Sequence, residues 1–159
     1  MRISRRLGTV VFGATALVVL AAGPAAAHVE PDPARVKPGK QATVEFTPEH
    51  GCGDSVTTEM DFKPPLGVTD ATPEEQDGWT ATVEGRRIVF TSDKVPDDET
   101  SFGITFSAPT KKTLLAWKVI QRCQDGVDRW IEGPKGESPA PIVGVGKNPP
   151  KAEEEDEGH

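Results

Sequence analysis

Apolar and polar residues alternate along several short stretches between residues 41 and 145, as Val44 with Phe46 and Ile104 with Phe106 illustrate. A period of two is typical of strands that bury one face, and almost no stretch has the 3.6-residue period of a helix. The pattern predicts strands at residues 41–47, 56–63, 79–83, 87–91, 102–107, 114–122, 127–131 and 141–145.

Turn-forming residues separate these predicted strands at intervals of roughly ten residues. Glycine, proline and aspartate fill the gaps, as in Asp125-Gly126, and these residue types allow the chain to reverse direction. Closely spaced strands with such turns favour an all-β fold, an antiparallel β-sandwich. Its large core candidates are Trp79, Trp117 and Trp130.

The first 27 residues have the three-part pattern of a secretory signal peptide. Three arginines occur in the first six residues, an apolar stretch covers residues 7–22, and Ala25-x-Ala27 ends a run of small residues. Cleavage after Ala27 would make His28 the first residue of the mature protein. We therefore expect a secreted or extracytoplasmic protein.

The chain has 159 residues and a formal net charge of −7, from 25 acidic and 18 basic side chains. Loss of the three leader arginines would change this charge to −10, which argues against a nucleic-acid partner. No second apolar stretch reaches the roughly 18 residues that span a bilayer. We expect one domain over residues 28–146, and an acidic tail over residues 147–159 that lacks the apolar residues needed for order.

The two cysteines, Cys52 and Cys123, would meet an oxidising compartment after export and pair by default. A bridge across a loop of this length contributes about 4 kcal/mol to stability in the chain-entropy model.

An N-terminal histidine brings three nitrogen donors together. The free α-amine, the following backbone amide and Nδ1 of His28 can close around one ion in a plane, which suits the tetragonal field of Cu(II). Zinc would require more side-chain ligands than the chain offers. The alternative is a frayed terminus that binds nothing. Prolines at positions 31, 33 and 38 oppose fraying, because they stiffen residues 29–40 along an edge of the sandwich.

Two other functions are open at this point. A histidine brace also serves copper oxygenases that attack polysaccharides, but those sites use a second histidine, and only His50 and His159 remain. The other alternative is a metal-free sandwich used for binding or adhesion.

Several short motifs occur in a fixed order along the chain. They are Ala27-His28-Val29, His50-Gly51-Cys52, Thr57-Thr58, Gly78-Trp79-Thr80, Pro96-Asp97-Asp98, Gln121-x-Cys123 and Arg129-Trp130-Ile131-Glu132-x-Pro134. In this order, and with the first at the predicted cleavage site, they resemble the YcnI-like family of exported copper-binding proteins. The resemblance spans residues 28–134.

The resemblance implies a cupredoxin-like or immunoglobulin-like sandwich and a disulfide between Cys52 and Cys123. It also implies one Cu(II) ion in a single-histidine brace at His28, with Trp130 close to the metal.

The family further places a carboxylate on the ion, and two residues fit that role about equally. Glu99 lies just before the predicted strand at residues 102–107, and Glu132 follows Trp130 by two residues. The implied function is that of a copper chaperone or buffer without catalytic turnover, which exchanges copper with trafficking proteins or transporters.

Overall fold

The computed structural model describes residues 28–49, 52–53, 55–92 and 100–150, and every regular element within these ranges is a β-strand. The strands are β1 (Val29–Asp32), β2 (Arg35–Val36), β3 (Gln41–Pro48), β4 (Thr57–Lys63), β5 (Thr69–Pro73), β6 (Thr80–Glu84), β7 (Arg87–Thr91), β8 (Phe102–Ser107), β9 (Thr113–Ala116), β10 (Lys118–Cys123), β11 (Val127–Trp130) and β12 (Ile142–Val145). The predicted leader, residues 1–27, lies outside the described ranges. Within them, no helix is long and apolar enough to cross a membrane.

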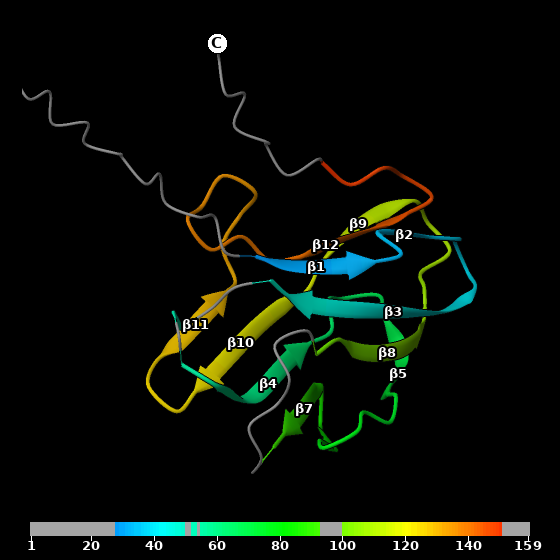
Figure 1. The fold of residues 1–159 in the computed structure, drawn as a ribbon. Coiled ribbons are helices and arrows are strands. Elements are labelled where there is room, and N and C mark those ends of the chain that lie inside the picture. The colour runs from blue at the N-terminus through cyan, green and yellow to red at the C-terminus, as the bar shows by residue number, and fades with distance from the viewer. Residues whose placement is uncertain (1–27, 50–51, 54, 93–99, 151–159) are drawn as a thin grey trace, which may run out of the picture.

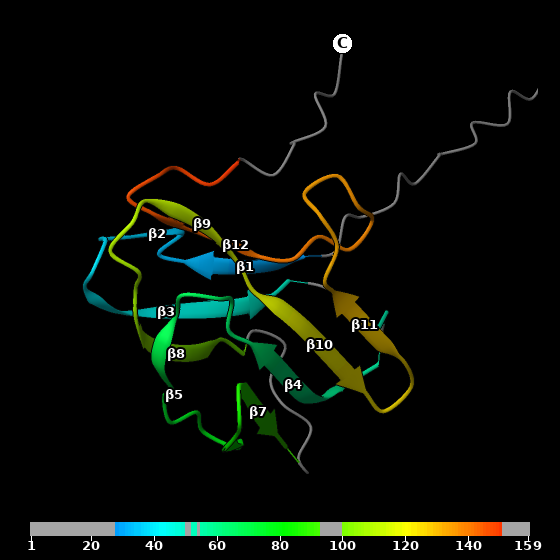
Figure 2. The ribbon, with the colours of Figure 1, turned by 180° about the vertical axis from the view of Figure 1, so that it is seen from behind.

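The strands form three sheets (Figures 1 and 2). A four-stranded sheet has the order β1-β3-β8-β5, a five-stranded sheet has the order β11-β10-β4-β7-β6, and a small sheet has the order β2-β12-β9. The pairings are antiparallel except for β2 with β12, which are parallel. The all-β antiparallel sandwich predicted from the sequence is confirmed, with this one parallel pair as an addition.

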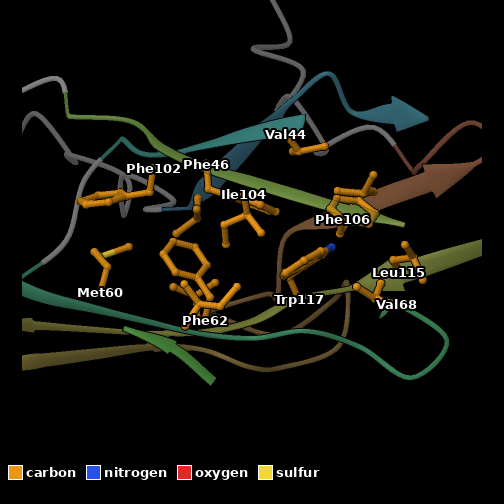
Figure 3. Packing of buried hydrophobic residues seen from close by; sticks show 14 of the residues in the cluster. Val44, Phe46, Met60, Phe62, Val68, Phe102, Ile104, Phe106, Leu115 and Trp117 are labelled. Atoms are coloured by element: carbon orange, nitrogen blue, oxygen red, sulfur yellow. The ribbon is translucent and has the colours of Figure 1, made fainter. Parts of the chain in front are cut away.

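Aromatic side chains from facing sheets fill the core (Figure 3). Phe46 of β3 lies 5.3 Å from Phe62 of β4 and 5.1 Å from Trp117, measured between ring centroids. Val44 and Phe46 point inward from β3 while their neighbours along the strand are exposed or half-buried. The period of two in the sequence therefore identified the inward face of β3.

Two of the three tryptophans predicted for the core are fully buried. Trp117 and Trp130 are 0% and 2% exposed, and half-buried Trp79 packs edge-on against Phe102. The indole N–H of Trp130 donates to Oε1 of Gln121, at 3.2 Å.

Most predicted strands agree with the structure to within one residue at each end, but the stretch at 114–122 is two strands. The break falls at Trp117, whose N–H donates to the carbonyl of Pro141 beside β12. The following residue, Lys118, begins β10 and pairs with β4 instead. The chain thus leaves the small sheet for the five-stranded sheet at this buried residue, and an apolar pattern does not reveal such a change of partner.

The predicted disulfide is present between Cys52 and Cys123, with a Cα–Cα distance of 6.3 Å and a sequence separation of 71 residues. It connects the end of β10 to the segment that follows β3. The bridge therefore fastens the connection between β3 and β4 to the five-stranded sheet.

Candidate metal centre

The pairing of β1 with β3 places His28 beside Glu49. The two strands are antiparallel, with Val29 opposite Pro48 and Glu30 opposite Thr47. Extending this register by one residue sets His28 opposite Glu49, and the N–H of Glu49 donates to the carbonyl of His28 at 3.0 Å. Figure 1 shows the start of β1 beside the end of β3.

Alternation along β1 then decides which side chains meet. Val29 is 3% exposed and belongs to the core, so its neighbours His28 and Glu30 project from the outer face of the sheet. Nε2 of His28 lies 3.3 Å from Oε1 of Glu30 and 3.2 Å from Oε2 of Glu49. Their ligand atoms all lie within 4.8 Å of one another.

This geometry suits a metal ion. Two donors that each lie about 2.0–2.1 Å from one ion are roughly 2.9–3.4 Å apart at bond angles of 90–109°. Both nitrogen-to-oxygen distances fall in this range. The side chains of His28, Glu30 and Glu49 are 28%, 56% and 42% exposed, so an ion can reach them from solvent.

The surrounding charge also favours a cation. Strands β1 and β3 carry Glu30, Asp32 and Glu45, and neither strand contains a lysine or an arginine. Asp32 and Glu45 are exposed and opposite each other in the register, on the same face as the candidate centre. An acidic face of this kind raises the local concentration of cations by long-range attraction.

The amide of Val29 does not take part in the pairing of β1 with β3. Because Glu49 bonds to His28, the two residues form a hydrogen-bonded pair, and the next pair, Val29 with Pro48, is a non-bonded one. The N–H of Val29 therefore points away from β3. Strand β1 is at the edge of its sheet, so this amide faces the open side.

The residues predicted from the sequence have different positions. His28 is at the candidate centre. Trp130 is in the core at the end of β11, where its indole N–H is occupied by Gln121. Glu132 is exposed in the loop after β11, and its Oε2 accepts a hydrogen bond from the N–H of Ser138 at 3.2 Å.

Within the described ranges, His28, Glu30 and Glu49 are the one group of three potential metal ligands, and Glu132 is not part of it. Glu99 and His50 lie outside those ranges. The sequence does not single out Glu30 and Glu49, because an extended edge over residues 29–40 does not by itself fix the register that sets His28 opposite Glu49. The signal that identifies them is the two-residue spacing from His28 to Glu30, together with the position of Glu49 two residues after the predicted strand at 41–47.

Fold and site together define a β-sandwich with a candidate metal centre at the start of an edge strand. The chain belongs to the family described as "Domain of unknown function (DUF1775)", whose model matches residues 28–89 and 85–145. No match among curated proteins is found.

Two solved structures are similar to the chain. One is an uncharacterized protein from Nocardia farcinica with an immunoglobulin-like fold, 23% identical, with a TM-score of 0.62 over 74% of this chain and 97% of that one. The other is a cohesin module from a family 33 glycoside hydrolase of Clostridium perfringens, 12% identical, with a TM-score of 0.49 over 75% and 93% of the two chains. The first similarity establishes an immunoglobulin-like fold, and neither it nor the family description assigns a catalytic function.

Proposed function

We propose that this protein binds Cu(II) at His28, with Glu30 and Glu49 as its carboxylate ligands, and that it serves outside the cytoplasm as a copper chaperone or buffer without catalytic turnover. The observation that carries the proposal is the position of the His28 imidazole between two carboxylates. His28 is also the residue that cleavage after Ala27 would make the first of the mature chain.

The donor set explains the choice of copper. Cleavage would add a free α-amine to the His28 imidazole, and the amide of Val29 already faces the open edge of the sheet. Nitrogen donors in a plane with carboxylate oxygens suit Cu(II), which also has the highest affinity among the common divalent ions. The disulfide is consistent with an oxidising compartment outside the cytoplasm.

The imidazole offers two nitrogens, and they imply two arrangements. Glu30 and Glu49 contact Nε2, whereas a brace with the α-amine uses Nδ1. The brace therefore requires the His28 side chain to turn about its Cα–Cβ and Cβ–Cγ bonds until Nδ1, in place of Nε2, faces the two carboxylates, so that the brace and both carboxylates serve one ion. We propose this combined set for the processed protein.

The resemblance to the YcnI-like copper proteins supports the same reading, and the match to the family model begins at His28. It also suggests that Trp130 approaches the ion. Since Gln121 holds the indole nitrogen, only the ring of Trp130 is available for that role. We favour Glu30 and Glu49 over Glu132 as ligands because they already contact His28. The expected partners are copper-trafficking proteins or transporters.

Isothermal titration of Cu(II) into protein that begins at His28 tests the proposed ligands. Glu49→Gln and Glu30→Gln should each weaken binding by about 10–100-fold, since each removes a charged ligand. Glu45→Gln is the matched control, because Glu45 is an exposed glutamate on β3, four residues before Glu49 and on the same face of the sheet. Equal effects of Glu30→Gln, Glu49→Gln and Glu45→Gln on copper affinity would show that only net charge matters. If Glu132→Gln alone weakened binding, the carboxylate ligand would be in the loop after β11.

A further inference from the structure

Three loops meet at the end of the sandwich away from the metal centre. The turn between β2 and β3 contacts the β8–β9 loop, where the N–H of Gly39 donates to the carbonyl of Pro109 at 3.0 Å. The segment after β12 lies beside β2, since the N–H of Gly146 donates to the carbonyl of Val36 at 2.9 Å. These contacts place residues 34–40, 107–113 and 144–150 next to one another.

These three segments contain basic side chains and no aspartate or glutamate. Their lysines are all exposed, and none forms an ion pair with another described residue. We name them the basic end: Lys37, Lys40, Lys111, Lys112 and Lys147. Five unpaired lysines in one place are unusual in a chain with a formal charge of −7, and nothing in the proposed copper site uses them.

The basic end and the metal centre are far apart. Lys40 precedes β3 and Glu49 follows it, so the eight residues of the strand separate them by about 27 Å. In Figure 1 the β2–β3 turn lies on the side opposite the start of β1. The two regions can therefore act independently.

The acidic tail starts at the basic end itself. The last described residue, Pro150, is three residues from Lys147, and Asn148 is held there by a 2.9 Å hydrogen bond from Arg35. The sequence then continues Lys-Ala-Glu-Glu-Glu-Asp-Glu through residue 157. Five consecutive acidic side chains thus follow a surface with five lysines.

We infer that the acidic run Glu153–Glu157 docks on the basic end of its own chain. By the random-coil relation, seven residues span a root-mean-square length of roughly 15 Å, which keeps the carboxylates within reach of the lysines. A tether of this length gives an effective concentration in the millimolar range. The tail therefore competes with free polyanions for the basic end, and an anionic partner has to displace it.

Zero-length carbodiimide crosslinking of the chain from His28 to His159, followed by mass spectrometry, tests the docking. Amide crosslinks should join residues 153–157 to several lysines of the basic end within monomers. They should persist on dilution and be lost in about 0.5 M salt, where screening shortens the range of the charges to roughly 4 Å. Lys63 and Lys118 are the matched control, because they are exposed lysines opposite each other on the five-stranded sheet and are not part of the basic end.

Equal crosslinking to Lys63 and Lys118 would overturn the inference, as would the absence of crosslinks. Crosslinks confined to dimers would also overturn it, because the tail would then belong to a second copy.

A second measurement uses retention on immobilised dextran sulfate. Truncation after Pro150 should increase the retention of the otherwise unchanged protein, because it uncovers the lysines of the basic end. The same truncation should have little effect in the Lys111→Gln/Lys112→Gln variant, because the tail and these lysines act as a pair. Equal gains in both backgrounds would mean that the tail acts only through net charge, which would overturn the inference. The outcome does not depend on copper binding, and copper titration of each variant keeps the two proposals separate.

Discussion

Removal of the disulfide should cost a large part of the stability of this domain. The bridge joins Cys52, beyond β3, to Cys123 at the end of β10, over 71 residues of sequence. That span includes most of the five-stranded sheet and the aromatic residues that face Phe46 across the core. The Cys52→Ser/Cys123→Ser variant keeps the shape of both side chains but leaves this long loop open in the unfolded state.

The magnitude follows from the length of the loop. The entropy of closing about 72 residues corresponds to roughly 4.4 kcal/mol at 25 °C in the chain-entropy model. A domain of about 120 residues has an unfolding entropy near 0.25 kcal/mol/K, so a loss of about 4 kcal/mol lowers Tm by about 16 °C.

Thermal and urea unfolding followed by circular dichroism measure this loss. Wild-type protein treated with a reductant should unfold at the temperature of the double-serine variant, whereas the variant itself should not respond to the reductant. A variant that unfolds within about 3 °C of untreated wild type would refute the reasoning. A thiol assay that finds two free cysteines in the untreated exported protein would contradict the pairing itself.

Three further outcomes are expected. Gln121→Met should lower the free energy of unfolding by about 1–3 kcal/mol, measured by urea titration, because the buried N–H of Trp130 loses its acceptor. Arg87→Met should lower the free energy of unfolding by more than Arg86→Met does, because it leaves the buried carboxylate of Asp61 unpaired, whereas Arg86→Met removes only hydrogen bonds to backbone carbonyls. The hydrogen bond with Asp61, followed by its charge, raises the pKa of Arg87 above its ordinary value. The stability that this shift contributes is therefore fully present below the ordinary pKa of arginine and is lost only as the pH rises through the raised pKa, so the effect of Arg87→Met should be constant from pH 6 to 9. Copper affinity measured by calorimetry should fall from pH 7.5 to 5.5 because protons compete for the nitrogen donors, and a pH-independent affinity would exclude those donors.

The parts of the fold that the sequence reveals are those in which one strand face is apolar. β7 and β8 agree with the prediction to the residue, since Phe90, Ile104 and Phe106 alternate or cluster as buried strands require. β5 has the sequence Thr-Asp-Ala-Thr-Pro and no apolar alternation. It pairs with β8 across a register irregularity at which Asp70 has a positive φ of 53°, and local sequence does not predict such a pairing.

The candidate metal centre likewise has one residue that the sequence reveals and others that only the fold brings to it. His28 is identifiable from the sequence because the leader pattern ends directly before it. Glu49 comes to His28 through the register of β1 on β3, which is a long-range property, and the prolines of residues 29–40 predict an extended edge but not that register. The basic end likewise depends on three loops that are distant in sequence and meet only through the topology.

The most direct test of the copper proposal compares protein that begins at His28 with protein that retains Ala27 before it. Electron paramagnetic resonance and competition titration with Cu(II) report the ligand field and the affinity together. We expect the additional residue to change the nitrogen hyperfine pattern and to weaken binding by at least about 100-fold, which corresponds to roughly 2.7 kcal/mol. An unchanged spectrum with unchanged affinity would contradict the claim that the freed terminus of His28 binds copper.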